Sequence, residues 1–357
     1  MKSKRTLAIY VLLYIASGLM YSMTTSKIID YQLGNKFYIL FTDAIVNIVI
    51  FAIISLHLNR NIKPTSLVIF SIFVSLAFSL YMKNSLISVT LFYFLLTLII
   101  DFDLIDSENR IVLLNRDDGM RNISFFKNFS QIIGFFVGSF IPDINNIFLA
   151  VLFIFLFSLK YFESIRESQS STLISEQKSS QKVYRLHWDI SWFFLIFLSS
   201  TTVFWIPIFI AKLNLLHQNS LYFIPFVLPG IISIIMLRLF AKASKPVITF
   251  LYLLGLILFI FSLNQNVWIP IVIFSILVGF NVVINMWLRN NILLKHSNQE
   301  NFIVLQCFEL VNCVILLIFS ALALLTEYIP YYLLFFDFIG ALGLLLHGWR
   351  QERLGSI

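Results

Sequence analysis

Three acidic side chains stand well inside long apolar stretches of this sequence: Asp43, Glu309 and Asp337. An ionised carboxylate at the centre of a bilayer costs about 2.5–3.5 kcal/mol even on a lenient insertion scale. Such a group must therefore pair with a cation or hold a proton, and no Lys or Arg stands in the middle of any apolar stretch. We expect these three carboxyl groups to be candidates for binding and releasing a proton.

Glu309 is the strongest of the three candidates, because Gln306 and Asn312 lie on its side of a helix. Asp43 stands in the outer third of its apolar stretch, and Asp337 stands among phenylalanines. An alternative for Glu309 is a neutral acid that hydrogen-bonds Gln306 or Asn312 and couples nothing. In both interpretations the carboxyl group holds a proton.

A second set of polar side chains recurs at helical spacing within the apolar stretches. In the first stretch, steps of four, three and four residues place the set on one helical face; its members are Tyr10, Tyr14, Ser17 and Tyr21. Asn281 and Asn285 form a shorter ladder, and buried amides need partners from another helix, water or a ligand. Either set could line a binding site or form a hydrogen-bonded seam between helices.

The stretches that carry these residues have the length and composition of membrane-spanning helices. The chain is 59% hydrophobic and 12% charged, whereas a soluble domain carries about 25% charged residues. Unbroken apolar runs long enough to cross about 30 Å of hydrocarbon favour helices over a barrel. We predict an all-α integral membrane protein with twelve transmembrane helices in two pseudo-symmetric six-helix bundles. The predicted spans are 6–26, 37–57, 65–82, 86–104, 122–142, 145–162, 188–211, 219–239, 246–263, 267–288, 301–325 and 329–348.

The positive charges support this number of spans. Twenty-one of the 25 Lys and Arg residues fall in alternate gaps between the predicted spans, and four fall in the other gaps. Cytoplasmic loops carry the excess of positive charge. We therefore predict a multi-pass protein of the cell membrane with both termini in the cytoplasm.

The longest polar gap, 163–187, is rich in Ser, Gln and charge, which is typical of a flexible linker. It divides the chain into predicted bundles at 1–162 and 188–357. Residues 60–64 and 242–246 both follow the pattern basic-x-x-Lys-Pro at an offset of 182 residues, and the same offset aligns Tyr10 with Trp192. The two halves are therefore predicted to be structural repeats.

This layout resembles the major facilitator superfamily over essentially the whole chain. The loop after the second span keeps basic residues of the family signature, Arg60 and Lys63, but lacks its Asp and Gly. The fifth span holds Gly134-Phe135-Phe136-Val137-Gly138, which is similar to the Gly-rich signature of antiporters. The stretch 109–141 is similar to drug and macrolide exporters of that superfamily.

The resemblance implies roles for the polar residues described above. In the family, spans one, four, seven and ten line a central cavity, so the ladders become candidates for substrate binding. The implied substrate-binding residues are Tyr10, Tyr14, Ser17, Tyr21, Trp192, Ser199, Thr202, Asn281 and Asn285. The implied cytoplasmic gating residues are Arg60, Lys63, Lys242 and Lys245.

The expected function is proton-coupled export of an amphipathic small molecule or hydrophobic peptide by alternating access, with protons carried by Glu309, Asp43 or Asp337. The expected partners are that substrate, protons and the lipid bilayer, and the protein is expected to act as a monomer. We expect no enzymatic activity, cofactor, metal or nucleic acid, and no nucleotide-binding signature occurs in the sequence.

Three alternatives remain open at the level of the sequence. The same fold could import a small neutral nutrient. A polytopic membrane enzyme is disfavoured because the external loops are short and His217 is the one histidine among them. A non-transporting receptor or immunity protein with this fold is the third alternative.

Overall fold

The computed structural model describes residues 2–31, 33, 35–55, 85–114, 119–140, 202–240, 243–294 and 298–355. These residues form ten α-helices and one 3₁₀ turn and contain no strand, which confirms the predicted all-α class. The helices are α1 (Lys2–Asp30), α2 (Tyr38–Ser55), α4 (Leu86–Leu114), α5 (Gly119–Phe140), α8 (Trp205–Leu215), α9 (Ile224–Leu239), α10 (Lys245–Ser262), α11 (Trp268–Leu294), α12 (Asn298–Leu325) and α13 (Ile329–Gly355), and the 3₁₀ turn η2 is Asn219–Leu221.

Nine of the predicted spans coincide with helices of the structure. Spans 65–82 and 145–162 and most of span 188–211 lie outside the described residues. The largest difference in bounds is at α4, which ends at Leu114 rather than at 104. A second difference is at α9, which begins at Ile224 rather than at 219. The intervening residues form η2, and Pro225 in the first turn of α9 suits a helix start because a first-turn N–H needs no partner within the helix.

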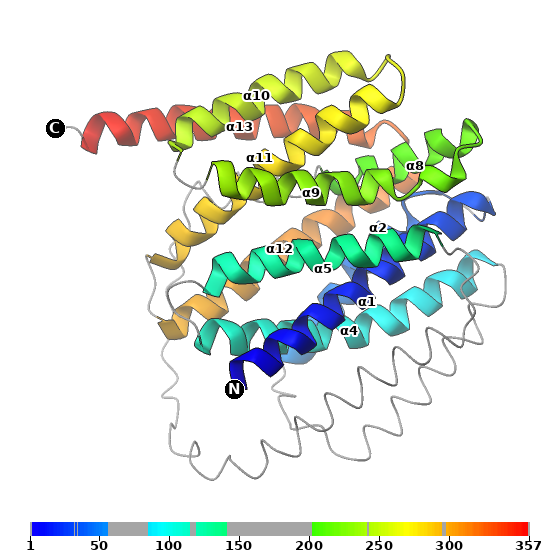
Figure 1. The fold of residues 1–357 in the computed structure, drawn as a ribbon, viewed down its shortest axis with the longest axis horizontal. Coiled ribbons are helices and arrows are strands. Elements are labelled where there is room, and N and C mark those ends of the chain that lie inside the picture. The colour runs from blue at the N-terminus through cyan, green and yellow to red at the C-terminus, as the bar shows by residue number, and fades with distance from the viewer. Residues whose placement is uncertain are drawn as a thin grey trace, which may run out of the picture.

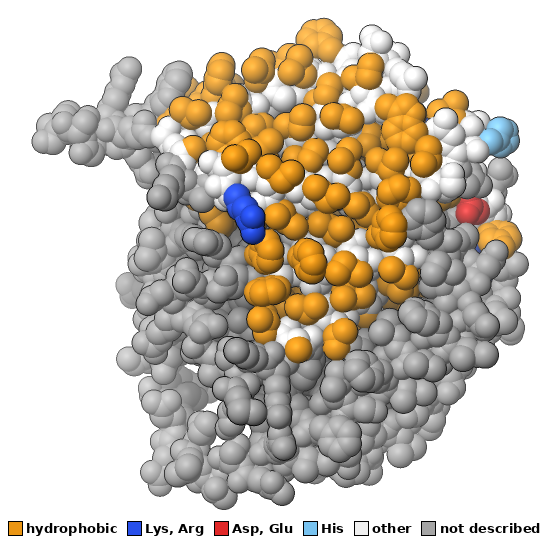
Figure 2. Space-filling view, viewed as in Figure 1, with side chains coloured by type: hydrophobic (Ala, Val, Ile, Leu, Met, Phe, Trp, Pro, Cys, Tyr) orange, Lys and Arg blue, Asp and Glu red, His pale blue; other side chains and the backbone are white. Residues whose placement is uncertain are grey.

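Three helices of the described chain are long and apolar enough to cross a membrane: 245–262, 268–288 and 329–346. On α10 the large exposed apolar side chains lie along one stripe, at Val247, Phe250, Leu254, Ile257, Leu258, Ile260 and Phe261. A stripe of large apolar side chains facing outward suits contact with lipid. Figure 2 shows the same property over a whole face, where the described surface is mainly hydrophobic and its charged side chains lie toward the two edges.

The helices lie side by side, and several neighbours are distant in the sequence (Figure 1). Within the first half of the chain, α1 packs on α4 and α5, and α2 packs on α4. Within the second half, α11 packs on α9 and α10, and α10 packs on α13. The halves meet where α2 packs on α12 and α5 packs on α9.

Glycines allow a close approach between α1 and α5. A Cβ atom on Gly134 would lie 2.2 Å from the carbonyl oxygen of Ile15, and one on Gly138 would lie 2.5 Å from that of Leu19. On the facing helix, a Cβ on Gly18 would lie 2.9 Å from the Gln131 carbonyl oxygen. Small residues four apart allow the backbones of membrane helices to touch in this way. The Gly134–Gly138 motif therefore has a packing role in this structure.

Candidate functional site

Asp43 on α2 accepts a hydrogen bond from the Tyr93 hydroxyl of α4, with Tyr93 Oη 3.0 Å from Asp43 Oδ1. Tyr93 is buried and Asp43 is half-buried. No cation pairs with Asp43 among the residues that the structure describes. The carboxyl group is therefore held by a neutral donor and keeps capacity for a proton or a cationic ligand.

Tyr21 of α1 joins this pair to an aromatic cluster. Its ring centroid lies 6.4 Å from that of Tyr93, 6.2 Å from that of Phe135 on α5 and 5.9 Å from that of Phe226 on α9. Phe135 and Phe226 stack with centroids 5.3 Å apart. Tyr21 and Phe135 are half-buried, so parts of these rings are open to contact. We call Asp43, Tyr93, Tyr21, Phe135 and Phe226 the acid–aromatic cluster.

The cluster combines residues from both halves of the chain at the contact between α5 and α9. Electron-rich ring faces attract cations, an effect worth about 0.5–1 kcal/mol when exposed and about 2 kcal/mol when desolvated. A carboxylate beside such rings adds a full negative charge. This arrangement suits an organic cation with an apolar body. When no cation is bound, the carboxyl group can hold a proton.

Of the predicted ladder on α1, the structure brings Tyr21 into this cluster and places the other members elsewhere. Tyr10 and Tyr14 are buried in the core of the first half, with ring centroids 4.7 Å apart. The Lys127 ammonium of α5 lies 5.2 Å from the Tyr14 ring centroid. Ser17 is half-buried on the same helix. The same helical face of α1 thus packs in the core at Tyr10 and Tyr14 and contributes to the acid–aromatic cluster at Tyr21.

Asn281 and Asn285 on α11 bond each other. Asn285 Nδ2 donates to Asn281 Oδ1 at 2.7 Å, and Asn281 is 3% exposed. The Asn285 Oδ1 atom is buried and has no hydrogen-bond partner among the described residues. An orphan acceptor of this kind is costly unless a water or ligand donor reaches it, so Asn285 remains a candidate for binding.

Asp337 on α13 is the most deeply buried described carboxyl group among the three candidates, at 1% exposed. Tyr252 Oη of α10 donates to Asp337 Oδ2 at 2.6 Å, and no described residue bonds Asp337 Oδ1. No cation pairs with it in the described part of the chain. The pair repeats the acid–tyrosine contact of Asp43 and Tyr93 but is sealed from the surroundings.

We expect Asp337→Asn to leave stability nearly unchanged, because an amide oxygen can still accept the Tyr252 hydroxyl. Asp337→Leu should lower the free energy of unfolding by about 1–3 kcal/mol, since that hydroxyl would be buried without an acceptor. Thermal unfolding of the purified protein in detergent measures both. An Asn variant that is as unstable as the Leu variant would mean that the fold needs the charge of Asp337.

The other predicted site residues are placed as follows. The Glu309 backbone lies in α12, but its side chain is outside the described residues, as are Trp192, Ser199, Arg60, Lys63 and Lys242. Thr202 is half-buried ahead of α8, and Lys245 is exposed at the start of α10.

No known protein-family model and no curated protein sequence matches this chain. The resemblance to the major facilitator superfamily therefore stays a prediction from the layout of the chain.

Tyr93, Phe135 and Phe226 are the cluster residues that sequence reasoning missed. Tyr93 stands between two phenylalanines in a predicted span and matches no ladder. Phe135 lies inside the Gly134–Gly138 motif, which was singled out for its glycines alone. Phe226 gives no signal of its own among 39 phenylalanines.

Proposed function

We propose that the chain is a secondary active transporter of the cell membrane that exports an amphipathic organic cation in exchange for protons. The observation that carries the proposal is the acid–aromatic cluster, in which Asp43 accepts the Tyr93 hydroxyl, has no cation partner among the described residues, and lies beside rings from both halves of the chain. The transporter works by alternating access and performs no covalent chemistry on its substrate.

Helix pairing supports an architecture of two repeated six-helix bundles. If the halves repeat, α2 corresponds to α9, α4 to α11, and α5 to α12. The observed contact of α2 with α4 then corresponds to that of α9 with α11, and the contact of α2 with α12 corresponds to that of α9 with α5. A pseudo-twofold axis interchanges each pair, as in transporters built from repeats.

Competition between the substrate cation and a proton for Asp43 would couple export of the cation to entry of the proton. In the inward-open state, a cytoplasmic cation displaces the proton from the carboxyl group, and the proton leaves to the cytoplasm. In the outward-open state, a proton from outside replaces the cation, which leaves. One monovalent cation moves out for each proton that moves in, so the exchange is electroneutral. Glu309 is a second candidate for carrying a proton.

The test is efflux from proteoliposomes with an imposed pH gradient. A fluorescent lipophilic monovalent cation and a neutral molecule of similar size serve as probes, and empty liposomes serve as the control. We expect gradient-dependent movement of the cation and weaker movement of the neutral probe. Equal movement with and without the gradient would rule out proton exchange, and movement of the neutral probe alone would rule out a cationic substrate.

A further inference from the structure

Where α1 and α12 end, an amide side chain from each half of the chain bonds a helix terminus of the other half. The last four carbonyl groups of a helix have no partner within it and need donors from elsewhere. Asn35 from the segment between α1 and α2 supplies a donor to α12, and Asn214 on α8 supplies one to α1.

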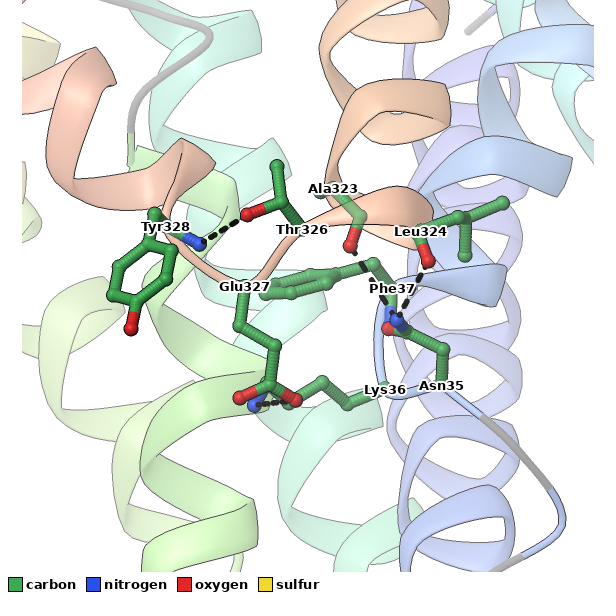
Figure 3. A network of polar contacts seen from close by, with 8 residues as sticks. All are labelled: Asn35, Lys36, Phe37, Ala323, Leu324, Thr326, Glu327 and Tyr328. Carbon is green, nitrogen blue, oxygen red and sulfur yellow. Dashed lines mark hydrogen bonds and ion pairs between the residues drawn. The ribbon is translucent and has the colours of Figure 1, made fainter.

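Asn35 is held in the orientation that this contact requires. Its Oδ1 accepts the Phe37 backbone N–H at 3.0 Å, which directs Nδ2 toward the end of α12. Nδ2 lies 3.4 Å from the Ala323 carbonyl oxygen and 3.5 Å from that of Leu324 (Figure 3). Phe37 is itself fully buried, and its ring centroid lies 5.8 Å from that of Phe204 in the second half.

The end of α1 is completed in the reciprocal way. Tyr31 N–H donates to the Lys27 carbonyl and Leu33 N–H donates to that of Ile28, both from the same half. The next carbonyl, of Ile29, receives Asn214 Nδ2 at 3.2 Å.

Two side-chain pairs flank these amides. Tyr222 Oη donates to Asp30 Oδ1 at 2.8 Å, again between halves. Lys36 Nζ lies 3.3 Å from Glu327 Oε1, but the Glu327 side chain is 73% exposed. Exposed ion pairs contribute little, so the amides and the tyrosine carry the contact. We call Asn35, Asn214 and the Tyr222–Asp30 pair the amide clamp.

We propose that the amide clamp is a reversible closure that holds the two halves together at this end of the protein. Water can replace each amide when the halves separate, because the freed groups are carbonyls at helix termini. The charge pattern places this end outside the cell. If the proposed transport is correct, the acid–aromatic cluster can release a substrate outward only after the clamp opens.

The closure is tested by the distance between the halves, measured without substrate or gradient. Spin labels are placed at Ile87→Cys and Leu325→Cys, whose native side chains are 72% and 84% exposed. The labelled full chain, with Cys307→Ser and Cys313→Ser, is studied in lipid nanodiscs. We expect Asn35→Ala with Asn214→Ala to raise the long-distance population relative to the short one by about fivefold or more, since two hydrogen bonds are lost.

Tyr222→Phe is the milder variant and should shift the populations in the same direction by less. Asn266→Ala is the matched control, because Asn266 accepts the Trp268 N–H within one half and bonds none of the described residues of the other. Unchanged distances in the double Asn variant, or an equal shift in the control, would overturn the closure. If the distance populations shift but the protein transports no probe, the closure by the amide clamp would stand and the proposed transport function alone would be rejected.

Discussion

Asp43→Asn is expected to abolish gradient-driven export and to weaken binding of a cationic probe about 30-fold or more. Removing one charge of a desolvated charge contact costs about 2–5 kcal/mol, and 1.4 kcal/mol corresponds to a factor of ten. The amide still accepts the Tyr93 hydroxyl, so the fold should remain intact. Binding of the probe by fluorescence and efflux from proteoliposomes give the two measurements, and a neutral probe should bind as before.

Asp337→Asn is the matched control for this experiment. Both acids accept a tyrosine hydroxyl across two helices, but Asp43 is half-buried beside Tyr21, whereas Asp337 is 1% exposed. We expect the Asp337 variant to retain gradient-driven export. Full gradient-driven export by the Asp43 variant would mean that another group carries the proton, and Glu309 would be the next candidate.

Tyr93→Phe separates the positioning of Asp43 from its charge. The variant keeps the ring but removes the donor at 3.0 Å, so the carboxylate loses the hydrogen bond from Tyr93. A single hydrogen bond to a charged group contributes about 1.5–3 kcal/mol. We expect export to continue with a shifted pH dependence, measured by varying the internal and external pH together. A profile identical to that of the wild type would show that Tyr93 does not influence the proton affinity of Asp43.

The existence of the helices could be predicted from the sequence, because long apolar runs have few folded alternatives in lipid. The stretches at 246–263, 267–288 and 329–348 correspond closely to α10, α11 and the apolar part of α13. The start of α9 was predicted too early, because the apolar residues Leu221, Tyr222 and Phe223 come directly before it and hydropathy does not distinguish a turn from a helix. A short turn is set by the backbone angles of a few residues, and hydropathy averaged over a whole span does not detect it.

The sites were less predictable because they depend on which helices meet and at what register. Helical spacing placed Tyr10 and Tyr21 on one face, but only the packing of α1 against α4 and α5 separates a buried Tyr10 from a partly open Tyr21. The amide clamp could not be predicted from the sequence for the same reason. Asn35 and Ala323 are 288 residues apart, and nothing in either local sequence identifies the other.

Gly134→Ala is expected to cause the largest loss of stability among these variants. The added Cβ would lie 2.2 Å from the Ile15 carbonyl oxygen and 2.8 Å from the Leu19 nitrogen. Both are backbone atoms that cannot rotate away, so α1 and α5 must separate. Overpacking costs about 1–3 kcal/mol and sometimes more, and this contact admits no side-chain relief. Thermal unfolding in detergent, with size-exclusion chromatography to detect aggregation, measures the loss.

Gly255→Ala is the control, because the one described side chain that its Cβ would meet is Leu277, at 3.0 Å, and that side chain can move. We expect this variant to remain close to the wild type in stability. The Gly134 result also bears on the site, because the next residue, Phe135, holds its ring 6.2 Å from that of Tyr21 across the same helix contact. A Gly134→Ala protein as stable as the wild type would mean that α1 and α5 do not meet at this register. The acid–aromatic cluster would then lose the contact that brings Phe135 to Tyr21.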